Sequence, residues 1–229
     1  MNLNELARKF DHTLLKATAA EADIRKLCDE ARQYGFASVC VNPCWVPLCA
    51  QLLQGSGVLV CTVAGFPLGA NATAVKVEEA RLAVAQGAGE VDMVINVGWA
   101  VEGRWDALQD EIRDIREAVG KVPLKVILET CYLNNDQIVR ACQSASRAGA
   151  AFVKTSTGFA TAGATPDHVR LMKKSVAAGV KVKASGGIRT LSDTLAMLEA
   201  GAERIGASAG VAIIKEYQGE SHAGVPVGY

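Results

Sequence analysis

Short apolar runs recur along the chain, and each follows a polar, helix-like segment that ends in glycine. The runs occupy residues 37–41, 58–63, 90–96, 124–129, 152–155, 180–184 and 203–207, and the preceding glycines are Gly35, Gly57, Gly87, Gly120, Gly149, Gly179 and Gly201. Glycine suits the left-handed position that closes a helix and lets the chain turn into a strand. The pattern predicts seven strands, and residues 11–14, after a short opening helix, can supply an eighth.

The segments between these runs carry apolar residues at helical spacing, most clearly over residues 75–85 and 108–119. Strands that alternate with helices form a parallel sheet. Eight such units in 229 residues fit a closed (β/α)₈ barrel. An open doubly wound sheet would have fewer strands and a Gly-x-Gly-x-x-Gly sequence opening a helix, which the chain lacks. We therefore predict an α/β fold: one TIM-barrel domain over residues 1–229, with a short N-terminal helix and a flexible tail from about residue 220.

Composition narrows the choice of partner and compartment. Lys plus Arg equal Asp plus Glu at 24 each, so no global field attracts nucleic acid or an anionic membrane, and a small molecule is the expected partner. The chain has neither a signal-like apolar segment near its start nor a long uncharged apolar stretch, which predicts a cytoplasmic protein. Its seven cysteines include no Cys-x-x-Cys pair, and its three histidines lack metal-ligand spacing. No metal and no cofactor is expected.

Two lysines, Lys154 and Lys183, lie inside runs that otherwise predict buried strands. An ammonium group is expensive to bury, so lysine is rare in such positions. If both side chains enter one cavity, their mutual repulsion and their desolvation favour a neutral amine, which is a carbonyl nucleophile. Taken alone, Lys154 could equally reach solvent from a strand end. Lys181 has the same strand parity as Lys183, so the two must differ in depth if they share a face.

In a TIM barrel the carboxyl ends of the strands line one mouth, where active sites form. Polar residues gather at the predicted strand ends: Asp11, Cys40, Asn42, Asp92, Asn96, Glu129, Lys154, Thr157, Lys183 and Ser185. The last two loops of this mouth, at residues 185–189 and 206–210, are rich in glycine. Backbone N–H groups in such loops can cradle a phosphate, although ordinary helix-entry turns have a similar composition. A phosphorylated substrate is therefore expected.

Three motifs, at residues 90–98, 154–159 and 182–189, together resemble the 2-deoxyribose-5-phosphate aldolase family, and the resemblance extends over almost the whole chain. It implies a metal-independent class I aldolase, a carbon–carbon lyase of deoxyribose phosphate catabolism. Such an enzyme interconverts 2-deoxyribose 5-phosphate with glyceraldehyde 3-phosphate and acetaldehyde through a lysine Schiff base. The resemblance also implies a homodimer.

The same resemblance assigns roles to individual residues. Lys154 would form the Schiff base, Lys183 would be the adjacent cation that favours its neutral form, and Asp92 would move protons with an ordered water. Asp11 would join a proton relay, and the terminal Tyr229 would assist proton transfer at the enamine carbon. The implied phosphate and substrate contacts are Thr157, Gly158, Gly186, Gly187 and Ser208. From the residues alone, Asp92 could instead cap a turn, Asp11 could cap a helix, and the tail could be a frayed terminus.

Three other functions remain open at this point. A different Schiff-base enzyme, such as a keto-acid aldolase, a dehydratase or a transaldolase, would use the same lysine chemistry on another donor. A phosphate-binding barrel isomerase would need a pair of carboxylates and no imine. A barrel that senses a sugar phosphate would bind it without turnover.

Overall fold

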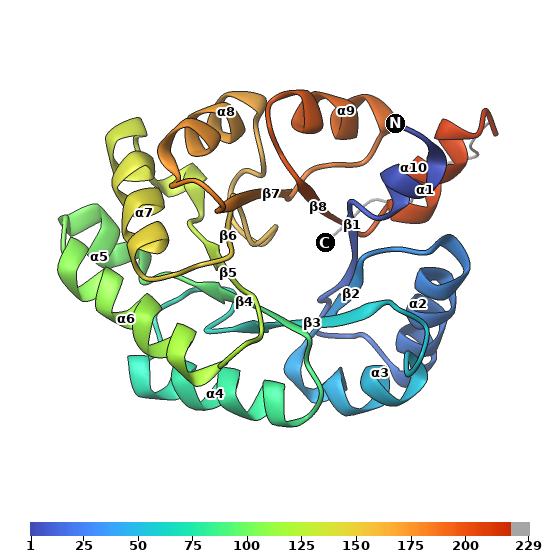
Figure 1. Cartoon of the computed structure of the whole chain (residues 1–229), viewed down its shortest axis with the longest axis horizontal. Helices are drawn as coiled ribbons and strands as arrows, with labels where there is room; N and C mark the ends of the chain where they lie inside the picture. The colour runs from blue at the N-terminus through green and yellow to red at the C-terminus, as the bar shows by residue number, and fades with distance from the viewer. Residues whose placement is uncertain (221–229) are drawn as a thin grey trace.

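Strands β1 to β8 form a closed barrel in the computed structural model, which describes residues 1–220 (Figure 1). The strands are β1 (Phe10–Leu14), β2 (Ser38–Val41), β3 (Leu59–Ala64), β4 (Glu90–Val94), β5 (Leu124–Ile127), β6 (Phe152–Lys154), β7 (Lys181–Ser185) and β8 (Arg204–Ala207). Each strand pairs in parallel with the next, and β8 returns to β1. The predicted (β/α)₈ barrel is thereby confirmed. Tyr229 and the predicted flexible tail beyond residue 220 lie outside the described residues.

Helices surround the barrel as an outer ring (Figure 1). They are α1 (Leu3–Ala7), α2 (Glu21–Tyr34), α3 (Val46–Leu52), α4 (Thr73–Ala85), α5 (Val97–Glu102), α6 (Trp105–Ala118), α7 (Asn135–Arg147), α8 (Pro166–Ser175), α9 (Leu191–Glu199) and α10 (Gly210–Tyr217), with 3₁₀ turns η1 (Pro43–Trp45) and η2 (Thr130–Tyr132). Helices α4 and α6 confirm the two clearest helical patterns, and α1 is the predicted opening helix. The short α5 was not predicted, since six residues are too few to display a helical period. No helix within residues 1–220 is long and apolar enough to cross a membrane.

The helix-closing glycines behave as the sequence indicates. Gly35 ends α2 with a φ of 68°, and its N–H donates to the carbonyl of Ala31. The other six glycines marked in the sequence also have positive φ. This left-handed conformation is strained for residues with a Cβ, so glycine at these positions lets the chain pass from helix to strand without that strain.

Side-chain alternation along each strand separates an apolar layer from a polar interior. On β4, Val91 and Met93 are fully buried members of the core that the strands share with the helices. Glu90 and Asp92, which alternate with them, are buried among charged groups from other strands. The barrel therefore encloses a cluster of charges beneath its mouth.

Candidate active site

Lys154 and Lys183 are direct neighbours across β6 and β7, where their Cα atoms are register partners. Their Nζ atoms both donate to Oδ2 of Asp92 on β4, at 2.9 Å from Lys154 and 2.8 Å from Lys183. Lys154 is 3% exposed, and the other two residues are fully buried. The structure thus brings together the three residues to which the sequence assigns the chemistry. Lys181, by contrast, is exposed at the start of β7, so depth does separate it from Lys183.

Asp11 extends this cluster from β1. Its Oδ2 accepts from Lys183 Nζ at 2.5 Å, and its Oδ1 accepts from Arg204 at 2.5 Å and from the Ser38 hydroxyl at 2.7 Å. The carboxylate is fully buried within a strand, so the helix-cap interpretation is wrong. Asp11 instead connects Lys183 to a second group of charges.

That second group comprises Lys125, Glu90 and Arg204, none of which the sequence pattern singles out as a site residue. Lys125 Nζ lies 2.8 Å from Oδ1 of Asp92 and 2.7 Å from Oε2 of Glu90, and Arg204 lies 3.0 Å from the same Glu90 oxygen. For Lys125, the alternation of side chains along a strand does carry a signal. Lys125 lies two residues before Ile127, the inward-facing last residue of β5, so its side chain points into the barrel as well. The strand-end pattern does not include these residues, because all three lie nearer the beginnings of their strands.

The surrounding charges determine which groups are ionised. Burial alone would raise the pKa of Asp92, but the ammonium groups of Lys125, Lys154 and Lys183 hold it well below its usual range. Burial alone would lower the pKa of Lys183, but the carboxylates of Asp11 and Asp92 raise it above its usual value. Asp92 is therefore a carboxylate and Lys183 an ammonium at neutral pH.

The two lysines differ in their partners. Lys183 is held between two carboxylates, Asp11 and Asp92. Within residues 1–220, Lys154 forms an ion pair with Asp92 alone, and it is the slightly more exposed of the two. Lys183 is thus a fully buried cation with two carboxylate partners, whereas Lys154 has one such partner and slight exposure.

Three glycines bring the loops that follow β6 and β7 into backbone contact. The Ala164 N–H donates to the Gly186 carbonyl at 3.0 Å, and a Cβ on Gly163 would lie only 2.1 Å from that oxygen. A Cβ on Gly186 would lie 3.5 Å from Cα of Gly158. Two predicted phosphate contacts, Gly158 and Gly186, therefore lie side by side, and a side chain at Gly163 would push the two loops apart.

The other predicted contacts have different surroundings. Gly187, with a φ of 78°, and Ser208 are exposed where the loops after β7 and β8 begin. Thr157 is 5% exposed, and its hydroxyl donates to a carboxylate oxygen of Glu129. The hydroxyl proton of Thr157 is thus already engaged by the protein.

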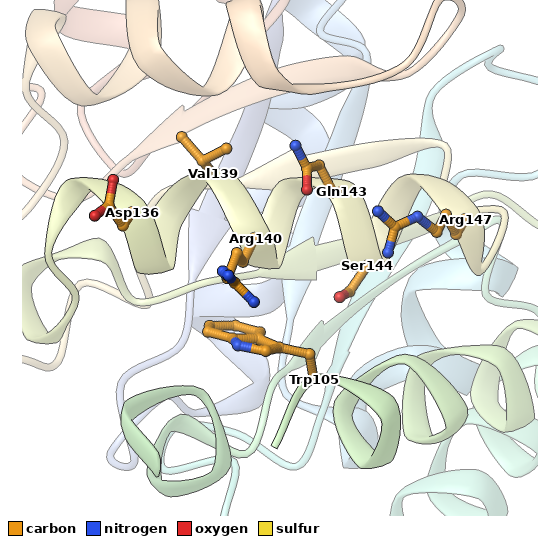
Figure 2. Close-up of a pocket in the computed structure, with 7 residues that line it drawn as sticks. All are labelled: Trp105, Asp136, Val139, Arg140, Gln143, Ser144 and Arg147. Atoms are coloured by element: carbon orange, nitrogen blue, oxygen red, sulfur yellow. The ribbon is translucent and has the colours of Figure 1, made fainter. Parts of the chain in front are cut away.

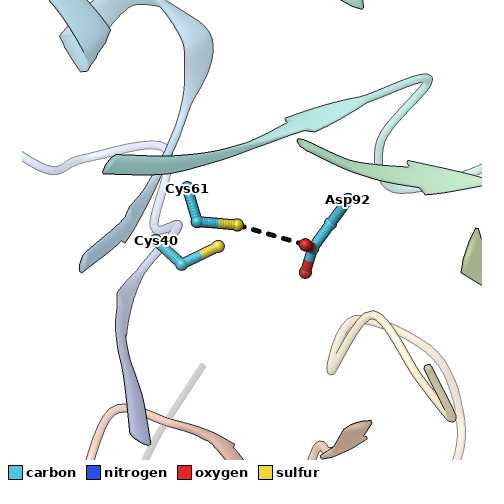
Figure 3. A group of neighbouring side chains, drawn as sticks. All are labelled: Cys40, Cys61 and Asp92. Carbon is cyan, nitrogen blue, oxygen red and sulfur yellow. Dashed lines mark hydrogen bonds between the residues drawn. The ribbon is translucent and has the colours of Figure 1, made fainter. Parts of the chain in front are cut away.

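Cys40, Cys61 and Asp92 form a compact buried group whose sulfur and oxygen atoms lie within 4.8 Å of one another (Figure 3). The Cys61 thiol donates to Oδ1 of Asp92 at 3.1 Å, and burial raises its pKa well above the usual value. Asp92 also accepts from three lysine ammonium groups. A metal cation here would meet those positive charges at close range, so the group does not fit a metal site.

A cavity of about 470 Å³ lies in the outer helical ring, between Trp105 at the start of α6 and one side of α7 (Figure 2). Figure 2 shows Arg140 above the Trp105 ring, with 6.0 Å between the guanidinium carbon and the ring centre. All residues that line the cavity belong to α6 and α7. The cavity is therefore separate from the lysine cluster inside the barrel.

Known proteins resemble this chain in sequence and in fold. The model of the DeoC/LacD family aldolases matches residues 6–216. The chain belongs to this aldolase family. It is 55% identical over 213 residues to a deoxyribose-phosphate aldolase from Geobacillus sp. (strain WCH70), covering 93% of this chain and 96% of that protein. It is 52% identical over 220 residues to the enzyme of that name from Caldanaerobacter subterraneus subsp. tengcongensis, covering 95% of each.

A solved structure of a deoxyribose phosphate aldolase from Aeropyrum pernix, described as tetrameric, has the same fold. It superposes with a TM-score of 0.87 at 34% identity and covers 95% of this chain and 92% of that one. As a DeoC/LacD family aldolase, the protein is a carbon–carbon lyase. The resemblance drawn from the sequence motifs is confirmed.

Proposed function

We propose that the protein reversibly cleaves 2-deoxyribose 5-phosphate to glyceraldehyde 3-phosphate and acetaldehyde through an imine on Lys154. The observation that carries the proposal is the shared oxygen of Asp92, which holds the amines of Lys154 and Lys183 together. An imine-forming lysine needs a way to lose its proton at neutral pH, and a fixed cation beside it favours that loss. Relatives at 52–55% identity carry the name of this activity.

The first step is addition of the Lys154 amine to C1 of the open-chain aldehyde. Asp92 is ionised and hydrogen-bonded to this nitrogen, so it can accept the proton that the amine loses, directly or through water. The carbinolamine then loses water and gives a protonated imine. Lys183 remains charged between Asp11 and Asp92 throughout, which keeps the positive charge beside Lys154.

The second step breaks the bond between C2 and C3. The C3 hydroxyl loses its proton to a base, the C2–C3 electron pair moves into the iminium, and glyceraldehyde 3-phosphate leaves an enamine on Lys154. Protonation at C2 and addition of water release acetaldehyde and the free amine. We assign the proton transfers to Asp92 with water, assisted by the relay through Asp11 and by Tyr229.

Phosphate recognition is assigned to the loops after β6, β7 and β8. Gly158 and Gly186 lie in contact, and Gly187 and Ser208 are exposed beside them at the same mouth. Backbone N–H groups at such loops bind phosphate without a charged side chain. We further propose a homodimer in the cytoplasm that acts in deoxyribose phosphate catabolism.

Borohydride reduction in the presence of acetaldehyde tests the proposal, because it converts an imine into a stable secondary amine. Peptide mass mapping should find an ethyl group on Lys154 after reduction with acetaldehyde, and none when acetaldehyde is omitted. The Lys154→Leu variant is the matched control and should remain unmodified. An ethyl group on Lys183, or none on either lysine, would overturn the role assignment.

A further inference from the structure

Glu129 has an unusual backbone conformation two residues after the end of β5. Its φ is 54° and its ψ is 62°, and within residues 1–220 no other non-glycine residue has a positive φ. A left-handed glutamate is strained, since its Cβ crowds the neighbouring carbonyl. Strain of this kind persists where surrounding contacts enforce it, and it concentrates at functional sites.

The contacts that enforce it come from Thr157. The two carboxylate oxygens of Glu129 accept the Thr157 N–H at 3.1 and 3.3 Å, and Oε2 also accepts the Thr157 hydroxyl. The same hydroxyl accepts the N–H of Phe159 at 3.0 Å. Glu129 is only 2% exposed, so this bracing takes place out of contact with solvent.

The bracing acts beyond the point where the strand ladder ends. The Leu128 N–H donates to the Lys154 carbonyl at 2.9 Å, and the Thr130 N–H donates to the Thr155 carbonyl at 3.0 Å. These two bonds already hold the backbone at Lys154. The carboxylate of Glu129 additionally holds Thr157. It thereby also restrains the next residue, Gly158, which lies against Gly186.

The carboxylate also carries an electrostatic penalty. Burial raises the pKa of Glu129, and the hydrogen bonds from Thr157 together with the charge of Lys154 offset only part of that effect. Glu129 is thus a strained and desolvated carboxylate whose described bonds all go to one residue of the loop.

We propose that Glu129 is a positioning residue for the phosphate of the substrate: by holding Thr157, it fixes the loop at Gly158 against Gly186 in the geometry that receives the phosphate. This inference rests on the proposed function, because it concerns the same substrate. It goes further because it assigns a residue to the phosphate end of the substrate. Lys154 and Asp92 act at the carbonyl end, whereas Glu129 acts at the phosphate end through Thr157 and does not touch the substrate.

The test compares 2-deoxyribose 5-phosphate with 2-deoxyribose, which lacks the phosphate. In Glu129→Gln, we expect KM for the phosphorylated sugar to rise about tenfold with kcat within about twofold, and kcat/KM for 2-deoxyribose to change by less than about twofold. An equal loss on both substrates, or no loss on either, would overturn the inference. Glu78→Gln, an exposed glutamate on α4, is the matched control and should change neither value.

A second variant keeps the test decisive if Glu129→Gln folds poorly. Thr157→Val removes the hydroxyl from the other side of the contact and should give the same phosphate-dependent rise in KM. The double variant should be no worse than Thr157→Val alone, because that change already removes the hydroxyl bond to Glu129, together with the acceptor for the Phe159 N–H. Borohydride trapping of acetaldehyde on Lys154 should persist in all three variants. Absence of that adduct in the unaltered protein would count against the proposed function, whereas an unaltered phosphate preference counts against the role of Glu129.

Discussion

Lys154 and Lys183 face each other across β6 and β7 and share one oxygen of Asp92, yet Lys183 alone also pairs with Asp11. This difference in partners gives the two lysines different chemical properties. Two carboxylates keep Lys183 charged. Lys154 has a single carboxylate partner, Asp92, which it shares with Lys183. The structure therefore supplies a physical reason for assigning the imine to Lys154 and the fixed cation to Lys183. In the sequence, that assignment rests on the family resemblance alone.

Replacing the nucleophile should remove activity without unfolding the protein. We expect Lys154→Leu to lower kcat by at least about 10³-fold, because Lys183, the amine beside it, is held as a cation between Asp11 and Asp92. Asp92 keeps its ion pairs with Lys125 and Lys183, so the buried carboxylate stays compensated. Steady-state cleavage assays and a thermal melt check both parts. Substantial residual activity would mean that Lys183 or another amine attacks the substrate.

Replacing the neighbouring cation should lower the rate. We expect Lys183→Leu to lower kcat by about 10²-fold, because Asp11 and Asp92 would lose the buried cation that they share and that lies beside Lys154. Lys181→Leu is the matched control on the same strand, since Lys181 is exposed two residues away. Its kcat should match that of the unaltered protein. An unchanged kcat in Lys183→Leu would refute the electrostatic role.

The barrel and the central site were predictable because each leaves a local signal. Glycine after an amphipathic segment marks the end of a helix, and a lysine inside an apolar run marks a buried charge. The position of Glu129 against Thr157 left no such signal, because it depends on how two loops separated by 28 residues meet. Lys125 and Arg204 were overlooked for a different reason. Their partners lie on other strands, and the barrel register alone places Lys125 opposite Asp92 and Arg204 opposite Lys183.

Acid should destabilise the protein through its buried carboxylates. The pKa values of Asp11 and Asp92 are both lowered on folding, because neighbouring lysine and arginine charges outweigh the desolvation that would raise them. Their stabilising contribution is complete above the unfolded-state pKa of 3.8. It is lost as the pH falls from there towards the folded-state values, since the unfolded chain then binds more protons. Melting temperatures measured from pH 6 to about pH 2 should fall steeply below about pH 4. Asp92→Asn, which removes one of these groups, should show a shallower acid slope, and an equal slope would contradict the assignment.

The contact between the loops after β6 and β7 can be tested by adding one methyl group. Gly163→Ala would place a Cβ 2.1 Å from the Gly186 carbonyl oxygen, so the loops must separate. We expect a rise in KM for 2-deoxyribose 5-phosphate of about tenfold and a loss of stability of about 1–3 kcal/mol. Gly98→Ala is the control, because its Cβ would approach a single side-chain oxygen at 3.3 Å. Comparable KM values for the two variants would show that the loop contact does not govern phosphate binding.

The charges beneath the lysine pair should matter for stability more than any ion pair on the surface. Arg204 is 14% exposed and pairs with Asp11 and Glu90, both of which are buried. Arg204→Met would leave two neighbouring carboxylates with Lys125 and Lys183 as their remaining cations, and we expect a loss of about 3–5 kcal/mol in the free energy of unfolding in urea. Arg81→Ala, which breaks an exposed pair with Glu78, should change it by less than about 1 kcal/mol. If the two losses were equal, the charges below the lysine pair would be solvated rather than mutually compensated, and Asp11 would lose its role in holding Lys183 as a cation.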